Sequence, residues 1–394
     1  MKRLIRLITV YSAIVCLMTA LCACGTQSLS DNAKGPDYNT LVKTGNMELE
    51  YASQYKVDYM GDYFLITIGN EQQFLLVPEE CEIPRQVPED ITILKQPLEN
   101  VYQVSSPIMD MIREIDALDH VQFTGTKKED WYIEGIPELM EAGNLKYAGK
   151  YSQPDYELLL AGKCSLAIEN TMIWHSPDAK EKLESLGIPV IVETASYEEH
   201  PLGRLEWIKL YGLLFGRMEE ACQFFDTQIE GLEHILPDNQ QGPGEEMEDS
   251  AQAGQKIAFF YVTSNGAVNV KKPGDYVAKI IEMAGGEYVP DWVDGQDETA
   301  MSAINMTLED FYASAKDADI IVYNSTVVTD ITSVDDLLKK SPLFTDFEAV
   351  KEGRVYCTGG NFYQQTTGVC YLIEDINKVL SGEEDGLFFL THLQ

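Results

Sequence analysis

The stretch "RMEEACQFFDTQIEGLEHIL", residues 217–236, decides the fold, because it is a single helical segment between two halves of the chain that share one pattern. Its apolar residues recur at three- and four-residue steps, the period of one face of an α-helix; they are Met218, Cys222, Phe225, Ile229, Leu232 and Leu236. Pro237 stops this pattern. We therefore predict one spanning helix over residues 217–237, a rod of ~28 Å at the usual rise per residue.

Strands alternate with helices on both sides of this segment. The alternation runs from about residue 90 to residue 192 and restarts at "KIAFFYV", residues 256–262. Such a pattern predicts parallel sheets with crossover helices. Three short strands come earlier, within residues 50–77. The fold class is therefore α/β: two Rossmann-like lobes, residues 46–216 and 256–394, joined by a single long helix, with a ligand cleft between them.

The N-terminus "MKRLIRLITVYSAIVCLMTALCACG" has the basic, apolar and small-residue regions of a secretory signal, which we place at residues 1–23. The residues Leu21 to Cys24 resemble the lipobox of bacterial lipoproteins, which implies that Cys24 is lipidated and becomes the mature N-terminus. An uncleaved anchor helix is the alternative. Polar residues predict a flexible tether at 24–45 and a flexible insertion at 238–255.

The chain carries a formal net charge of −35, and removal of the signal makes it more acidic still. This charge excludes nucleic acid as a partner and opposes binding to anionic lipid headgroups. No other apolar run reaches the ~18 residues of a membrane span. Five cysteines remain beyond Cys24, and their odd number and wide spacing argue against zinc or a disulfide framework. We expect them to be small buried hydrophobic residues.

In this order of signal, lobe, helix and lobe, the chain resembles the substrate-binding lipoproteins of bacterial ABC importers, in the helix-linked class that carries ferric siderophores, haem and cobalamin. The stretches that carry the resemblance are "SYEEHPLGRLEWIKLYGLLFG" (196–216), "FYVTSNGAVNV" (260–270), "PDYELLLAGKCSLAIEN" (154–170) and "TLEDFYASAKDADIIVYNST" (307–326). The resemblance implies a monomeric receptor without catalysis or cofactor. It would sit lipid-anchored on the outer face of the cytoplasmic membrane and deliver a metal chelate to a permease with ATPase subunits.

The resemblance also implies that each lobe offers one glutamate to the permease. Glu157 falls on that position in the first lobe and Glu309 in the second. The spacing from Glu309 to its strand is one residue longer, so Asp310 is an alternative. A carboxylate in the first turn of a helix is also favoured by the helix dipole alone, which leaves a purely structural explanation open for each residue.

Ligands of parallel α/β lobes bind outside the carboxyl ends of the strands, and two such lobes form a cleft there. The candidates that follow strands are Ser106, Trp131, Tyr132, Trp174, Tyr197, Arg204, Asn265, Asn324, Tyr363 and Gln364. The aromatic residues suit a large, flat or greasy ligand with amide or carboxylate edges, such as a corrin, porphyrin or siderophore. Alternatively, Trp131 or Trp174 packs over the core of its own lobe.

Arg204 stands at the start of a segment that is apolar nearly all round, residues 205–215, which predicts a buried helix. Such a helix would hold the guanidinium at the cleft rim, where it suits a carboxylate or phosphate edge of a ligand. A structural ion pair with Glu198, Glu199 or Glu206 is the alternative. The neighbouring His200 is a candidate axial ligand of a chelated metal.

Other classes of protein are disfavoured by missing motifs. No two histidines have helical metal-site spacing, and the chain lacks the HExxH, GxSxG, P-loop and GxGxxG motifs. A secreted hydrolase would have to assemble its site from scattered residues. A surface receptor without a permease is the other alternative; it would share the two lobes but would not need Glu157 and Glu309.

Overall fold

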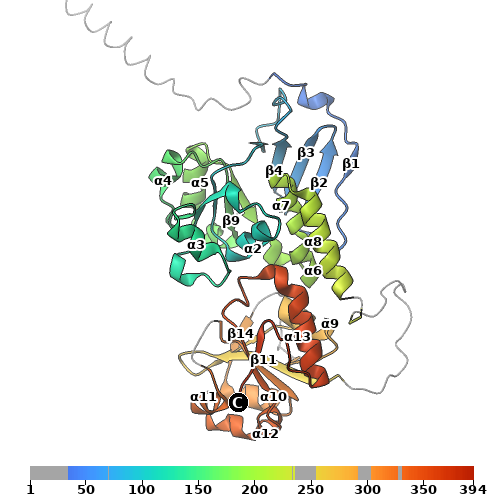
Figure 1. Cartoon of the computed structure of the whole chain (residues 1–394), viewed down its shortest axis with the longest axis vertical. Coiled ribbons are helices and arrows are strands. Elements are labelled where there is room, and N and C mark those ends of the chain that lie inside the picture. Colours follow the sequence, from blue (N-terminus) through green and yellow to red (C-terminus); the bar gives the residue numbers. More distant parts are fainter. Residues whose placement is uncertain (1–33, 70, 233, 236–253, 292–302, 327–330) are drawn as a thin grey trace, which may run out of the picture.

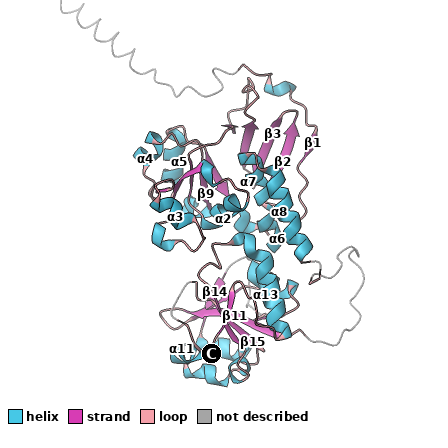
Figure 2. Ribbon diagram, in the orientation of Figure 1, coloured by secondary structure: helices cyan, strands magenta, loops and turns pink. Residues whose placement is uncertain are grey.

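The computed structural model describes residues 34–69, 71–232, 234–235, 254–291, 303–326 and 331–394 (Figure 1). The predicted signal, Cys24 and nearly all of the predicted insertion lie outside these residues. Within the described part of the chain, we find no helix with both the length and the apolar character needed to cross a bilayer. Two α/β lobes are present, as predicted, and Figure 2 shows helices gathered where they meet.

The N-terminal lobe begins with a sheet of its own in the order β1-β2-β3-β4-β5, antiparallel except for the parallel pair β4 and β5. Its strands are β1 (Gly45–Asn46), β2 (Tyr55–Met60), β3 (Tyr63–Ile68), β4 (Gln72–Val77) and β5 (Ile91–Lys95). Alternation along β3 and β4 turns one apolar face to the main core and the other to a small second core. The sequence predicted the three central strands but not that they form a separate sheet.

The prediction of a polar tether up to residue 45 is wrong for its last part. Gly35 N–H donates to the carbonyl oxygen of Ile83 at 2.9 Å, and Tyr38 N–H donates to that of Arg85 at 2.8 Å. Tyr38, in the 3-10 helix η2 (Tyr38–Thr40), packs against the second core of the first sheet together with Leu41. Main-chain hydrogen bonds and two apolar side chains therefore hold this segment, although its composition is polar.

The second sheet of the N-terminal lobe is entirely parallel, in the order β10-β9-β6-β7-β8. Its strands are β6 (Val101–Gln103), β7 (Val121–Thr124), β8 (Lys146–Tyr147), β9 (Ala167–Asn170) and β10 (Val190–Glu193). The helices between them are α2 (Ser106–Glu114), α3 (Ile136–Glu141), α4 (Tyr156–Ala161) and α5 (Pro177–Ser185), with the 3-10 turns η3 (Leu118–His120), η4 (Lys128–Asp130) and η5 (Thr171–His175). This is the predicted alternation, and it brings the ends of β6, β9 and β10 to one edge.

The sheet of the C-terminal lobe is mixed, in the order β14-β12-β11-β15-β16-β17, with β13 also paired to β11. Its strands are β11 (Lys256–Val262), β12 (Val268–Lys271), β13 (Glu287–Val289), β14 (Ala303–Met306), β15 (Ile320–Tyr323), β16 (Val355–Thr358) and β17 (Leu390–His392). Four strands of this sheet, β13, β11, β15 and β16, pair in parallel. Strand β12 is antiparallel to β11, to which a tight hairpin joins it. Strands β14 and β17 pair antiparallel to β12 and β16. The predicted parallel sheet is therefore right for the centre alone.

The helices of this lobe complete the α/β pattern. They are α9 (Tyr276–Met283), α10 (Leu308–Ala315), α11 (Val334–Lys340), α12 (Glu348–Lys351) and α13 (Val369–Ser381), with the 3-10 turns η7 (Pro342–Asp346) and η8 (Thr366–Gly368). Gln255, which we predicted in the flexible insertion, belongs to this lobe, because its side chain donates to the carbonyl oxygen of Leu380 and accepts from Arg354.

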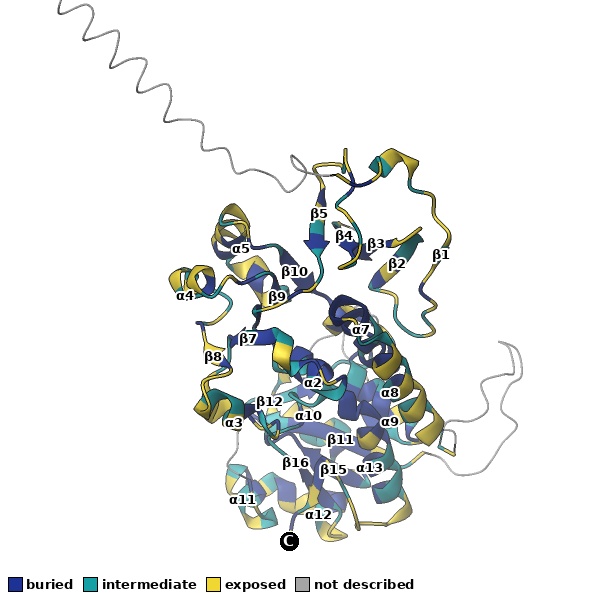
Figure 3. Cartoon of the chain, turned by 45° about the horizontal axis from the view of Figure 1, so that its top comes forward, coloured by how far each residue is buried: buried dark blue, intermediate teal, exposed yellow. Residues whose placement is uncertain are grey.

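Three helices follow β10 along the chain before the C-terminal lobe: α6 (Pro201–Glu206), α7 (Ile208–Phe215) and α8 (Met218–Gly231). The predicted spanning helix is too long, since α8 ends at Gly231, a weak helix former, and Leu232 caps it. Ala221 and Phe225 form its buried face, and Figure 3 shows α7 buried beside the partly exposed α8. One apolar cluster runs from the first sheet through α7 to α9 and α13, so the lobes meet over more than a single rod.

Candidate functional site

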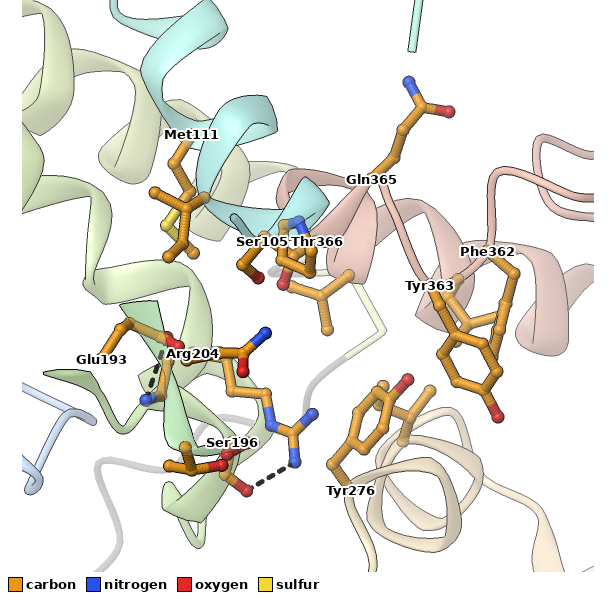
Figure 4. A pocket seen from close by; sticks show the side chains of 18 of the residues that line it. Ser105, Met111, Glu193, Ser196, Arg204, Tyr276, Phe362, Tyr363, Gln365 and Thr366 are labelled. Atoms are coloured by element: carbon orange, nitrogen blue, oxygen red, sulfur yellow. Dashed lines mark hydrogen bonds between the residues drawn. The ribbon is translucent and has the colours of Figure 1, made fainter. Parts of the chain in front are cut away.

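A cavity of about 360 Å³ lies between the two lobes, at the carboxyl ends of β6, β9 and β10 (Figure 4). The N-terminal lobe supplies α2, the residues after β9 and β10, and one arginine of α6, whereas the C-terminal lobe supplies α9, α13 and the loop before η8. The polar lining residues are Ser105, Asn170, Thr171, Glu193, Ser196, Arg204, Tyr276, Tyr363, Gln365 and Thr366. Met111, Ile108, Phe362 and Leu372 are among the apolar ones. The cavity thus combines one guanidinium, one carboxyl group and an apolar wall.

Arg204 is the cation of this cavity. Its Nη2 donates to the carbonyl oxygen of Ser196 at 3.0 Å, and its Cζ lies 3.8 Å from the ring centre of Tyr276 in the other lobe. Its Nε is buried and has no hydrogen-bond partner among the described residues. The guanidinium is therefore held in place by one carbonyl group and one aromatic ring.

Glu206 and Glu198, which we considered as ion-pair partners of Arg204, bind other groups instead. Glu206 accepts the backbone N–H groups of Glu50, Tyr51 and Ala52, at 2.8–3.0 Å, and the Lys209 ammonium at 2.7 Å. Glu198 accepts from the backbone of residues 53–54 and from the indole of Trp207. Both side chains are fully buried. They fasten the chain before β2 to α6, so neither is free to pair with Arg204.

Glu193 is the lining residue that sequence reasoning missed. It ends β10, is only 8% exposed, and its Oε1 accepts the Ala195 N–H at 3.0 Å. Burial raises the pKa of its carboxyl group to about 7, although the Ala195 N–H and the Arg204 charge oppose the rise. The available signal was a charged residue at the end of the otherwise apolar strand "PVIVE".

Tyr363 lines the cavity, and Asn324 positions it. Asn324 Nδ2 donates to the Tyr363 hydroxyl oxygen at 2.8 Å, and Asn324 is 1% exposed. Asn324 therefore lies behind the cavity wall rather than in it. Ser106 opens α2 without lining the cavity, whereas its neighbour Ser105 does line it.

Tyr132 and Gln364 join the lobes instead of lining the cavity. The Tyr132 backbone N–H donates to Gln364 Oε1 at 2.9 Å, and Gln364 Nε2 donates to the carbonyl oxygen of Asp130 at 2.7 Å. A second contact of this kind is buried: the carboxylate of Asp110 on α2 accepts both the N–H and the hydroxyl of Thr367, at 2.9 and 2.5 Å. A third contact joins the Lys279 ammonium of α9 to the carbonyl oxygen of Glu199 at 2.6 Å. Hydrogen bonds at three places thus link the lobes among the described residues.

The remaining aromatic candidates separate into buried and exposed groups. Trp131 is 7% exposed and belongs to the main apolar cluster, which is the alternative we raised for it. Trp174 and Tyr197 are 50% and 43% exposed and stack with ring centres 5.9 Å apart and planes 14° apart. They do not line the cavity but follow Thr171 and Ser196, which do. Asn265 lies in the exposed β11–β12 turn, where its Oδ1 accepts the Thr263 hydroxyl.

His200 has a structural position at the start of α6. Its Nδ1 accepts the Leu202 N–H at 3.2 Å as the helix N-cap, and its ring stacks on Tyr51 with centres 4.7 Å apart. Burial and the nearby Lys279 lower its pKa. In the described part of the chain, no three His, Cys, Asp or Glu side chains gather as a metal site. Cys164, Cys357 and Cys370 are buried, and Cys81 and Cys222 are only partly buried; all five are free thiols.

The two predicted docking glutamates lie on different lobes. Glu157 is exposed in the first turn of α4, and Glu309 is exposed in the first turn of α10. Among the described residues, neither side chain has a hydrogen bond or an ion pair. Asp310, the alternative, accepts the hydroxyl of the N-cap Thr307 at 2.7 Å. The geometry therefore favours Glu309 over Asp310 as a side chain free to meet a partner.

Comparison with known proteins gives three findings. Residues 114–361 match the model of a family described as periplasmic binding protein. Two uncharacterized lipoproteins of Methanocaldococcus jannaschii are 24% and 25% identical to the chain; the matches cover 78% and 86% of this chain and 72% and 82% of theirs.

Solved structures share the fold. The periplasmic heme binding protein HutB of Vibrio cholerae aligns with a TM-score of 0.54 and 16% identity, over 71% of this chain and 98% of that one. The siderophore binding protein BauB, solved with acinetobactin and ferric iron, aligns with a TM-score of 0.54 and 15% identity, over 73% of this chain and 95% of that one.

Proposed function

The chain belongs to the periplasmic binding protein family. From this premise we propose that it is the extracytoplasmic substrate-binding protein of an ABC importer. It captures an iron complex (siderophore or haem) or cobalamin between its lobes. The observation that carries the proposal is the interlobe cavity with one oriented guanidinium and an apolar wall. Structural neighbours that bind heme or a ferric siderophore support the ligand class.

The size of the cavity refines this proposal. Its volume of about 360 Å³ is near the lower end of the ~300–1,000 Å³ range of small-molecule sites. A cavity of this volume therefore suits a compact ligand or the polar edge of a larger one. A whole macrocycle requires the lobes to separate further. The exposed Trp174–Tyr197 stack next to the cavity suits the flat part of such a ligand.

The proposal includes a membrane anchor and a permease. Lipidated Cys24 holds the protein on the outer face of the membrane, as the lipobox resemblance and the lipoprotein relatives support. Glu157 and Glu309 contact the permease from the two lobes, a role that their exposure and lack of partners support. Ligand binding would favour the closed arrangement of lobes that the permease recognises.

The test is a titration of the mature protein with haemin, cyanocobalamin and a ferric hydroxamate, followed by tryptophan fluorescence. We expect saturable binding of one of them at micromolar concentration or below. Arg204→Ala should weaken it about tenfold or more, because a charge-assisted hydrogen bond is lost, and Trp174→Ala should also weaken it. Tyr147→Ala, which removes an exposed aromatic ring elsewhere on the N-terminal lobe, is the control. No binding of any of the three would refute the proposal.

A further inference from the structure

Glu193 lies among donors that have no partner of their own. Tyr211 of α7 is 1% exposed, its hydroxyl has no hydrogen-bond partner among the described residues, and its electrostatic partners include Glu193. Arg204 Nε is unpartnered in the same way. The titratable groups that interact electrostatically with the Glu193 carboxyl group are Arg204 from α6, Tyr211 from α7 and Glu198 from the loop before α6. Buried donors without partners cost free energy. Arg204 lines the cavity and Tyr211 does not, so the guanidinium is the group at this end of the cavity that suits a ligand with acceptors.

The charge of Glu193 is the obstacle to such a ligand. An ionised carboxyl group in the cavity would repel the anionic edge that Arg204 is placed to hold. Burial raises the pKa of Glu193 to about 7, so near neutral pH both of its forms are populated. A second negative charge nearby raises the pKa of a carboxyl group further. Arrival of an anionic ligand therefore favours the protonated form, which is a hydrogen-bond donor.

We propose that Glu193 is a specificity-determining residue of the cavity, whose protonated carboxyl group donates a hydrogen bond to the same ligand carboxylate that the Arg204 guanidinium binds. This inference rests on the proposed function and extends it by naming the ligand chemistry: an apolar body with a carboxylate edge. Capture then takes up one proton from solvent for each protein molecule in which Glu193 is ionised. Release of the ligand returns that proton.

The pH dependence follows from this linkage. Because the bound state holds the proton, affinity is highest below the pKa of the free protein and falls as pH rises through about 7. The dissociation constant should then increase up to about tenfold per pH unit, since one proton is involved. A ligand without a carboxylate would show no such dependence through Glu193.

The experiment measures haemin binding, because haemin carries carboxylate groups, with cyanocobalamin and a ferric hydroxamate as comparison ligands. Dissociation constants are measured from pH 6.5 to 8.5 by tryptophan fluorescence. The affinity of the wild type for haemin should fall steeply above pH 7. Glu193→Gln, which keeps an N–H donor but cannot ionise, should bind haemin with little pH dependence. Glu199→Gln, which changes an exposed glutamate of the same loop, should behave as the wild type.

A direct measurement needs no variant. Calorimetry of haemin binding to the wild type in two buffers with different ionisation heats gives the number of protons taken up, which we expect to approach one above pH 7. No proton uptake, or a pH dependence that persists in Glu193→Gln, would overturn the role of Glu193. Binding of cyanocobalamin or the hydroxamate but not haemin would also overturn it, while leaving the proposed function intact. Binding of none of the three would remove both.

Discussion

Glu169 is a buried acid whose two carboxyl oxygens have no hydrogen-bond partner among the described residues. It lies on β9, next to the cavity residue Asn170, and its interaction partners include Tyr102 and Tyr156. Burial raises the pKa of Glu169 to about 9. At the scale of the residue, the N-terminal lobe thus contains two acids, Glu169 and Glu193, whose pKa values are raised by burial. Only Glu193 lines the cavity, so Glu169 affects stability rather than binding.

The substitution Glu169→Gln should remove part of the pH dependence of stability. In the unfolded chain a glutamate ionises near pH ~4.3, whereas folded Glu169 keeps its proton up to about pH 9. The contribution of Glu169 to the free energy of unfolding is therefore fully present below the unfolded pKa and is lost progressively as pH rises toward about 9. The measurement is the urea midpoint at pH 5, 7 and 9. We expect the urea midpoint of Glu169→Gln to rise relative to that of the wild type as pH rises. The midpoint of Glu181→Gln, on an exposed face of α5, should follow the wild type. Equal slopes for wild type and Glu169→Gln would contradict the argument.

At the scale of elements, α6 contacts both the cavity and the chain before the first sheet. Its first turn is capped by His200, its middle offers Arg204 to the cavity, and its last residue, Glu206, fastens the chain before β2. The buried carboxylates of Glu198 and Glu206 satisfy the backbone N–H groups of residues 50–54, which belong to no strand or helix. The first sheet is therefore attached to the lobe by charged side chains as well as by apolar packing.

Glu206→Gln should destabilise the protein by about 3 kcal/mol, because an amide turns N–H donors toward the backbone donors and leaves buried groups unsatisfied. The free energy of unfolding in urea is the measurement. Glu230→Gln, on the exposed side of α8, is the matched control and should stay within ~0.5 kcal/mol of the wild type. A loss from Glu206→Gln no larger than that of the control would show that the anchor contributes nothing measurable.

At the scale of the whole molecule, the two lobes meet through the Asp110–Thr367 contact, the Gln364 contact and the Arg204–Tyr276 stack. Glu157 on α4 and Glu309 on α10, one in each lobe, are exposed glutamates in the first turn of a helix, and neither side chain has a hydrogen bond or ion pair among the described residues. Charges at two separate points define the orientation of a partner and its rate of association more than its affinity. A partner that contacts both glutamates at once binds only when the lobes have the matching relative position.

The double variant Glu157→Ala, Glu309→Ala should bind its ligand as the wild type does, because neither residue lines the cavity, yet it should fail to support uptake in cells. The matched control is Glu181→Ala, Glu352→Ala, which also removes one exposed glutamate from each lobe. The measurements are the dissociation constant of the purified protein and ligand accumulation by cells that carry each variant. Normal uptake by the Glu157, Glu309 variant would refute the docking role, and impaired binding would contradict its separation from the cavity.

The amino-acid sequence by itself determined the order of strands and helices, the two α/β lobes and a buried helical segment beside Arg204. The predicted start of that segment is wrong, because α6 begins at Pro201 and holds Arg204 in its last turn. These features depend on apolar periodicity and on glycine and proline, which act over a few residues. The tertiary structure alone decided that Trp131 is buried, that Asn324 supports Tyr363, that Gln364 joins the lobes and that Glu193 faces the cavity. The physical reason is that these roles depend on contacts between segments far apart in the chain, and the burial of a polar side chain follows from the elements packed around it.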